Sequence, residues 1–314
     1  MASPRLSTIS VGATKLGLCA RTKFLVMRFN QRVEMSRILN KTRQIAIQMS
    51  RSVLHRAGLS IVRADRLKQI IETQKSEFDI GFVRHFESHL SHKIIDALGN
   101  SKAQLRQDIL ALICVDWKRG GFFVEFGATD GVGLSNTHFL EKDFGWDGIL
   151  AEPARVWHNK LKENRNCIID LECVWSQSGQ MVDFCETPWS EISTSLEHIN
   201  SDSHGKLRKY YDSYQVKSIT LNDLLVKHDA PRRMDYLSID TEGSEFDILN
   251  KFDFEKYSFQ LITCEHNYSP NRERIHSLLT RNGYVRILQD VSQFDDWYVD
   301  GNIVSCVPVC NLDA

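Results

Sequence analysis

Two patterns of apolar and polar residues follow one another along the 314-residue chain. As far as about residue 115 the apolar positions recur at helical spacing, most clearly in the amphipathic stretch 103–121, which ends at two glycines. From residue 122 on, short apolar runs of strand length alternate with amphipathic stretches that stop at a glycine or a turn. We therefore predict an N-terminal helical part followed by a region of alternating strands and helices.

The second region has the order of elements that is typical of an α/β domain. Strands separated by helices form βαβ units, in which the strands are mostly parallel and the helices cover both faces of the sheet. We therefore predict a doubly wound, mostly parallel sheet. The expected strands are 122–127, 147–153, 167–175, 234–243 and 259–267, the expected helices are 134–145, 154–164, 218–228, 244–254 and 271–284, and a terminal strand or hairpin is expected at 285–300.

One segment, 176–214, does not follow this alternation. Apart from a strand-like piece at 181–187, we expect it to be irregular. Its part 186–214 is long for a loop in a compact domain, and such loops are often lids or binding loops. We therefore expect contacts with the acceptor in 186–214, where Trp189 is a candidate for stacking on a sugar ring.

Several polar motifs stand where predicted strands end. In a sheet of this type the carboxyl ends of the parallel strands meet at one edge, and ligands bind there. We therefore expect these motifs to converge on one site. They are GATDG (127–131), AEP (151–153), VWSQ (174–177), DTEG (240–243) and EHNY (265–268).

The glycines after the first strand let the backbone approach a ligand closely. A phosphate-binding loop needs a Lys in register, and none follows Gly127. A dinucleotide fingerprint needs a third glycine or alanine where Asn136 stands, so that match is poor. What is left is the spacing Glu125, Gly127, Gly131, in which the acidic residue favours a cationic ligand over a pyrophosphate.

Acidic residues mark two further strand ends. Glu152 lies about 20 positions after the glycine turn, where nucleotide-binding domains place an acid that binds ribose hydroxyls. Taken alone, Glu152 would suit NAD equally well. After the fourth predicted strand, Asp240, Glu242 and Glu245 follow within a short stretch. Such crowding of carboxylates is unfavourable unless a cation, a metal or a proton-transfer role compensates it.

Three motifs, VEFGATDG (124–131), ILAEP (149–153) and LSIDTEGSEFDIL (237–249), together resemble those of the FkbM-type methyltransferases. This family is a branch of the class I S-adenosylmethionine-dependent methyltransferases, and the resemblance covers about residues 120–290. It implies a Rossmann-like, seven-stranded sheet with a terminal antiparallel hairpin, and S-adenosyl-L-methionine as cofactor. It also implies methyl transfer to oxygen, often to sugar hydroxyls of glycans, glycolipids or secondary metabolites.

The resemblance further implies a cofactor pocket at these motifs. The glycine turn would bind the amino-acid end of the cofactor, the acid after the second strand would bind the ribose, and the end of the third strand would bind the adenine. The residues predicted to contact the cofactor are Glu125, Gly127, Thr129, Gly131, Asn136, Glu152, Trp175, Ser176 and Asp240.

A hydroxyl acceptor needs a group that takes up its proton. Asp240 or His266 is the expected catalytic base, and Glu265 is expected to orient the base or to bind the acceptor. A purely structural role of His266 is the alternative. We expect no metal, because a sulfonium needs no Lewis acid. In a metal-dependent enzyme the ligands would be Asp240, Glu242, Glu265 and His266.

Charge is distributed unevenly along the chain. Residues 1–60 hold eleven Lys and Arg and one acid, Glu34, whereas the whole chain has a net charge of −1. Three interpretations of this basic leader stay open: a transit peptide, a helical arm that contacts an anionic membrane or the body, and a translation start placed too far upstream. The predicted domains are a basic arm (1–60), a helical extension (61–119) and a methyltransferase domain (120–314).

Composition also bears on partners and location. No apolar run approaches the roughly 20 residues of a membrane span, and no secretory signal is evident. Eight scattered cysteines without a C-x-x-C favour reduced thiols, so we expect a cytoplasmic protein, or an organellar one if the leader is a targeting signal. The acidic body has no basic stripe, which argues against nucleic acid as a partner. The sequence does not indicate an oligomeric state.

Three functions are compatible with these observations. The first is an O-methyltransferase acting on a carbohydrate, glycolipid or glycan, and the second is a methyltransferase of a non-sugar metabolite. The third is a non-catalytic binding protein on a methyltransferase fold. The joint presence of Glu125, Gly127, Gly131, Glu152 and Asp240 argues against the third, because a fold without activity need not keep them together.

Overall fold

The computed structural model describes residues 64–187, 193–199, 208 and 210–310. The chain divides into two compact units, Met1–Thr73 and Gln74–Ala314. In the first unit the described part is the beginning of helix α2 (Ala64–Arg84), where the described side chains are exposed. The predicted basic arm 1–60 and Trp189 lie outside the described residues.

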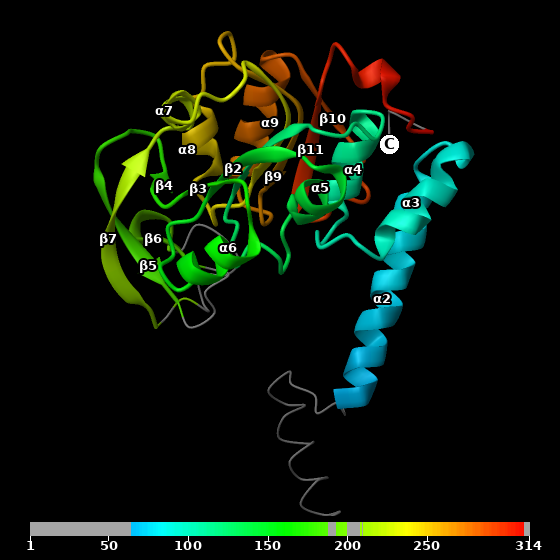
Figure 1. The fold of residues 1–314 in the computed structure, drawn as a ribbon, viewed down its shortest axis with the longest axis horizontal. Helices are drawn as coiled ribbons and strands as arrows, with labels where there is room; N and C mark the ends of the chain where they lie inside the picture. Colours follow the sequence, from blue (N-terminus) through cyan, green and yellow to red (C-terminus); the bar gives the residue numbers. More distant parts are fainter. Residues whose placement is uncertain (1–63, 188–192, 200–207, 209, 311–314) are drawn as a thin grey trace, which may run out of the picture. The chain divides into compact units, whose positions relative to one another are not determined.

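A seven-stranded sheet forms the core of the second unit, with the strand order β10-β11-β9-β8-β1-β2-β3 (Figure 1). The strands β3, β2, β1, β8 and β9 are parallel, and β11 runs antiparallel between β9 and β10. The predicted doubly wound, mostly parallel sheet with a terminal hairpin is thereby confirmed. The strands are β1 (Phe122–Phe126), β2 (Asp147–Ala151), β3 (Ile168–Asp170), β8 (Arg233–Ile239), β9 (Ser258–Glu265), β10 (Tyr284–Ile287) and β11 (Asp295–Asp300).

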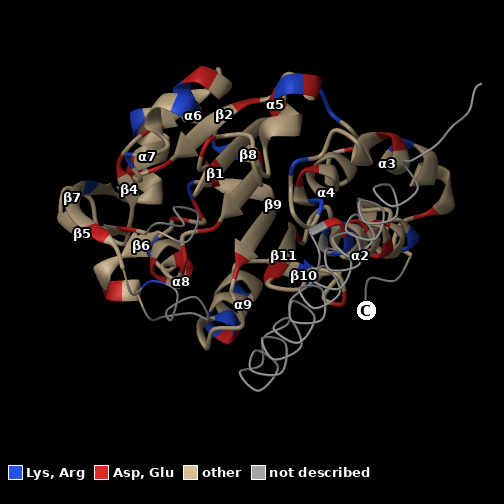
Figure 2. Cartoon of the chain, turned by 90° about the horizontal axis from the view of Figure 1, so that it is seen from below, with Lys and Arg blue, Asp and Glu red and all other residues tan. Residues whose placement is uncertain are grey.

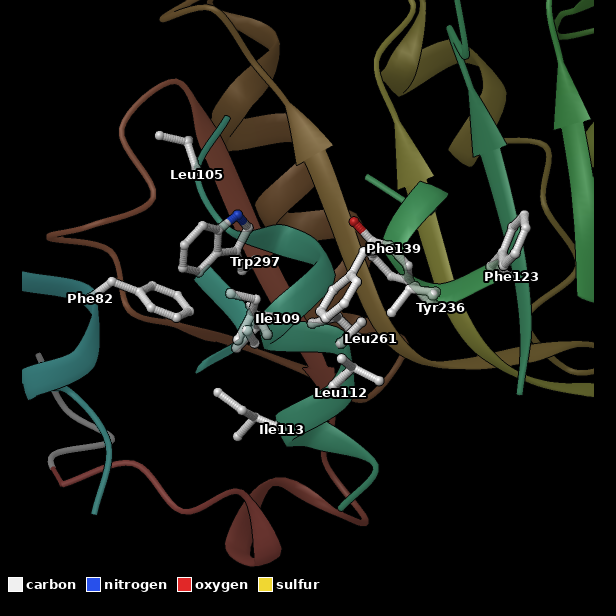
Figure 3. Close-up of a cluster of buried hydrophobic side chains, with 14 of the residues drawn as sticks. Phe82, Leu105, Ile109, Leu112, Ile113, Phe123, Phe139, Tyr236, Leu261 and Trp297 are labelled. Carbon is white, nitrogen blue, oxygen red and sulfur yellow. The ribbon is translucent and has the colours of Figure 1, made fainter. Parts of the chain in front are cut away.

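Helices pack on both faces of this sheet. Successive side chains of a strand point to opposite faces, so Phe123 and Val124 of β1 belong to different apolar clusters. Residues of α4, α5 and α6 pack in the Phe123 cluster, and residues of α7, α8 and α9 in the Val124 cluster. Figure 3 shows part of the first cluster, with Ile109 and Trp297 close to Phe82. The helices are α4 (Gln107–Cys114), α5 (His138–Phe144), α6 (His158–Asn164), α7 (Leu221–Lys227), α8 (Glu245–Leu249) and α9 (Asn271–Arg281).

The helical extension ahead of the sheet continues with η1 (Ser88–Leu90) and α3 (Ser91–Leu98) before α4. The helix predicted over 103–121 is much shorter, because Arg106 adopts a left-handed conformation with φ 64° directly before α4. Two side-chain nitrogens of Arg106 hold this conformation by donating to Asp79 at 2.8 and 3.1 Å. All positions from Gln107 to Ile113 are buried, so the amphipathic pattern belongs to an internal helix.

The segment between β3 and α7 contains a second sheet. The strand predicted over 167–175 is split between the two sheets, because its end forms β4 (Cys173–Val174). The second sheet has the order β4-β7-β5-β6, with β5 (Met181–Glu186), β6 (Thr194–Ser195) and β7 (Asp212–Ile219). The strand-like piece expected at 181–187 is confirmed as β5, whereas the expectation of irregular structure was wrong at β6 and at the first residues of β7. These strands are short or partly exposed, so they lack a continuous apolar pattern.

The predicted end of α5 is confirmed, since Gly145 follows it in a left-handed conformation with φ 65°. Its beginning lies slightly later than predicted, at His138. The hydroxyl of Ser135 accepts hydrogen bonds from the N–H groups of Thr137 and His138 at 3.2 and 3.1 Å, as a residue that caps the helix would.

Two further features concern the described residues only. None of their helices is long and apolar enough to cross a membrane. Their cysteines are free, and Cys306 and Cys310 near the C-terminus are exposed. Most of the others are buried or half-buried, as expected for reduced thiols in a core.

Candidate active site

A cavity of about 290 Å³ lies at the carboxyl ends of β1, β2 and β8, and the second sheet contributes to its wall. Its volume is close to the lower end of the range of roughly 300–1,000 Å³ for small-molecule sites. Nine predicted site residues line it, whereas Gly131, Ser176 and His266 do not. The nine are Glu125, Gly127, Thr129, Asn136, Glu152, Trp175, Asp240, Glu242 and Glu265.

Glycine is required at two positions of the turn after β1. Gly127 has φ 75°, and a Cβ there would overlap the backbone carbonyl oxygen of Asp240 at the end of the neighbouring strand. Gly131 has φ 79°, and a Cβ there would lie 2.6 Å from Cγ of Arg165. Left-handed backbone and close approach both exclude a larger residue. The turn therefore requires glycine at both positions of the predicted spacing. Gly127 lines the cavity, whereas Gly131 packs against Arg165 and does not line it.

Glu125 is buried at the end of β1 and binds the chain that follows the glycine turn. Its carboxylate accepts hydrogen bonds from the backbone N–H of Asn136 at 2.7 Å and from the hydroxyls of Ser135 and Thr137. Much of its hydrogen-bonding capacity is therefore used within the protein. Glu125 shapes the cavity wall as well as lining it.

Glu152 follows β2 and is also buried. One carboxylate oxygen accepts the N–H of Thr129 and the other the N–H of Ala154, each at 2.8 Å. Burial raises the pKa of Glu152 to about 7. Each carboxylate oxygen has a second lone pair, so Glu152 can still accept hydrogen bonds from two ribose hydroxyls.

Three carboxyl groups gather after β8 and β9. Oxygen atoms of Asp240, Glu242 and Glu265 lie within 4.8 Å of one another. Figure 2 shows acidic residues around the ends of these two strands, near α8. Glu242 is paired with the buried Arg208 at 2.7 Å. Glu245 lies apart from this group, where it accepts the N–H groups of Thr241 and Gly243.

Asp240 and Glu265 form a hydrogen-bonded pair. Burial, followed by the charge of Glu242, raises the pKa of Asp240 to about 8. Burial and the neighbouring Asp240 raise the pKa of Glu265 well above its usual range. The raised pKa of Glu265 favours its protonated form, in which it donates a hydrogen bond to Asp240. A cation beside the pair would favour the ionised form of Asp240.

His266 has a different position from the one that a base would need. It is buried, and its Nδ1 accepts the N–H of Tyr268 at 3.0 Å. Its Nε2 lies 3.8 Å from Asp296, and burial lowers the pKa of the ring. The imidazole thus holds the turn after β9, and it is not part of the carboxyl cluster that could hold a metal.

The second sheet supplies cavity residues that the sequence analysis did not identify. Phe184 of β5 and Thr194 and Ser195 of β6 line the cavity together with the predicted Trp175. The Oγ of the buried Ser195 has no hydrogen-bond partner among the described residues. Gln104, from the helical extension, also lines the cavity. The length of the segment that holds Thr194 and Ser195 had indicated contacts from this part of the chain, but it identified none of these residues.

A family model described as the methyltransferase FkbM domain matches residues 125–297, which is more than half of the chain. The chain belongs to the FkbM methyltransferase family. The matched region spans the glycine turn, Glu152, the second sheet and both acidic strand ends. The chain therefore contains a methyltransferase domain of a family that uses S-adenosylmethionine.

Solved structures of methyltransferases resemble this FkbM-family chain at low sequence identity. FkbM from Methylobacillus flagellatus is 12% identical, with 57% of this chain and 43% of that chain covered and a TM-score of 0.34. This chain thus spans less than half of that protein. An O-methyltransferase from Bacillus cereus, in complex with SAH, is 12% identical over 81% of this chain and 99% of that chain, with a TM-score of 0.33. No curated protein sequence matches significantly.

Proposed function

We propose that this methyltransferase methylates a hydroxyl group of a carbohydrate, glycolipid or glycan. The observation that supports a hydroxyl acceptor is the Asp240–Glu265 pair in the cavity, and the carbohydrate class follows from the resemblance to the FkbM-type family. A hydroxyl is a weak acid, so its attack on a methyl group is assisted by a base that takes up the proton. Once ionised, a carboxylate with a raised pKa is a stronger proton acceptor than an ordinary one, and a positively charged sulfonium beside it favours the ionised form.

The cavity residues fit S-adenosylmethionine in one orientation. Glu152 would accept the ribose hydroxyls, and the rings of Trp175 and Phe184 would contact the adenine. The hydroxyl of Ser195, which is buried beside these rings, would form a hydrogen bond with the adenine. The methionine end would then lie at the glycine turn near Asp240. When bound, the cofactor supplies a methyl group on a positively charged sulfonium.

Asp240 is the proposed base. Glu265 donates a hydrogen bond to it, which orients the Asp240 carboxylate. As the acceptor oxygen receives the methyl group from the sulfonium, the hydroxyl proton passes to Asp240. The proton that the reaction releases is therefore held by the Asp240–Glu265 pair. We do not propose His266 as the catalytic base, because it does not line the cavity. We propose no metal, since positioning and a base are sufficient for this displacement.

The helical extension would work together with the methyltransferase domain. Gln104, which is exposed, places part of the predicted extension 61–119 in the cavity wall of the domain predicted as 120–314. We propose that the side chain of Gln104 contacts the acceptor. Contact of the basic arm 1–60 with an anionic membrane stays a prediction, because that arm lies outside the described residues.

A label-transfer assay tests the proposed function. The protein is incubated with tritiated S-adenosylmethionine and separate extracts of glycans, glycolipids and non-sugar metabolites. We expect label in the glycan or glycolipid fraction, and its loss in Asp240→Asn. Asp235→Asn is the matched control, because Asp235 is a buried acid at the other end of the same strand and does not line the cavity. Label confined to the non-sugar fraction would overturn the proposed acceptor.

A further inference from the structure

A buried arginine stands behind the cofactor turn. Arg165 follows α6, and its side chain is completely inaccessible to solvent. A buried guanidinium is unfavourable unless its donors are satisfied. No motif in the sequence pointed to this residue.

The guanidinium of Arg165 binds the chain between the glycine turn and α5. It donates to the carbonyl oxygen of Gly131 at 3.1 Å, to the hydroxyl of Ser135 at 3.1 Å and to the hydroxyl of Thr137 at 2.9 Å. Its Nε donates to Glu141 of α5 at 2.6 Å. One side chain therefore connects the turn and the helix that follows it.

Glu125 binds the same segment from the opposite side. The hydroxyls of Ser135 and Thr137 donate to Glu125 while they accept from Arg165. Arg165 and Glu125 also lie 3.7 Å apart as an ion pair. The segment that ends the turn is thus held between two buried, opposite charges. Such a fully satisfied network permits few alternative conformations.

The held segment carries cavity residues. The Asn136 N–H is fixed by Glu125, Thr129 in the same turn donates to Glu152, and both Asn136 and Thr129 line the cavity. A Cβ at Gly131 would strike Arg165, so the turn and the guanidinium are packed against each other. Any shift of Arg165 would therefore move the cavity wall.

We propose that Arg165 is a positioning residue for S-adenosylmethionine, which acts by holding the turn 127–137 in the shape that binds the cofactor. Arg165 would not contact the cofactor itself, because it does not line the cavity. Lysine cannot replace it, since an ammonium group has neither the planar fork nor the reach to satisfy four acceptors at once. The inference rests on the cofactor orientation proposed above.

Calorimetric titration with S-adenosylmethionine tests this inference, because it yields both the dissociation constant and the fraction of binding-competent protein. For Arg165→Lys we expect a dissociation constant at least about tenfold higher, with stoichiometry close to that of the wild type. Asp235→Asn removes the charge that pairs with Lys118 and one of the two oxygens that accept from Lys118, Gln260 and the Phe122 N–H, far from the turn. This control should lower the melting temperature and leave the dissociation constant unchanged.

A milder variant covers the case in which Arg165→Lys does not fold. Ser135→Ala removes the hydroxyl that joins Arg165 to Glu125, and we expect it to fold and to bind the cofactor a few-fold more weakly. Unchanged affinity in both variants would overturn the inference, and so would a loss of stoichiometry alone, which indicates a merely structural role. Absence of binding by the wild type would instead contradict the cofactor site itself.

Discussion

Binding of S-adenosylmethionine should release a proton from the Asp240–Glu265 pair. The pKa of Asp240 is about 8, so at pH 7 only about one molecule in ten carries the charged form. A sulfonium at about 5 Å, at an effective dielectric constant near 20, would stabilise that charge by about 3 kcal/mol. This corresponds to about two pH units, so the pKa would fall to near 6 and about 0.8 proton would leave at pH 7.

The sign of the pH dependence follows from this release. Because the bound state holds fewer protons, the affinity for S-adenosylmethionine should rise with pH, by up to about tenfold per unit between roughly pH 6 and 8. It should level off above the pKa of the free protein. S-adenosylhomocysteine has no sulfonium, so its affinity should vary much less over the same range.

Calorimetry in buffers with different heats of ionisation measures the released proton directly. We expect the apparent binding enthalpy of S-adenosylmethionine to vary with the buffer, and that of S-adenosylhomocysteine to stay nearly constant. Asp240→Asn should abolish the difference between the two ligands. Equal proton release with both ligands, or none with either, would refute the assignment of the sulfonium to the Asp240 carboxyl group.

Four other substitutions give separate tests of the site. Gly127→Ala should abolish cofactor binding or folding, because its Cβ would overlap the Asp240 carbonyl oxygen; normal binding in calorimetry would contradict the tight turn. Trp175→Ala should raise the dissociation constant for S-adenosylmethionine about tenfold, and Ser195→Ala a few-fold. An unchanged constant in both would place the adenine elsewhere. His266→Ala should keep most of the label transfer of the wild type, whereas complete loss with the fold intact would make His266 the base.

The fold was largely predictable because its signals are local. Each parallel strand of the main sheet is a short apolar run followed by a turn, and Gly145 ends its helix as a glycine in that position commonly does. The second sheet was not predictable in the same way. Of its strands beyond β4, the sequence indicated β5 as the strand-like run 181–187, but β6 has only two residues and β7 is exposed at its beginning, so neither shows a continuous apolar run.

The candidate site, too, was predictable only in part. Motif spacing placed Glu152 and Asp240 at neighbouring strand ends, and the structure brings both into one cavity. It also suggested His266 next to Glu265, but successive residues after a strand need not face the same side. Arg165 and Ser195 carry no motif, because their roles depend on partners far away in the sequence.

A crystal structure with S-adenosylhomocysteine tests the central claim most directly. The account predicts both ribose hydroxyls within hydrogen-bonding distance of the Glu152 carboxylate, the adenine beside Trp175 and Ser195, and the sulfur on the side of Asp240. Density for the ligand outside this cavity, or with the adenine at the glycine turn, would contradict it.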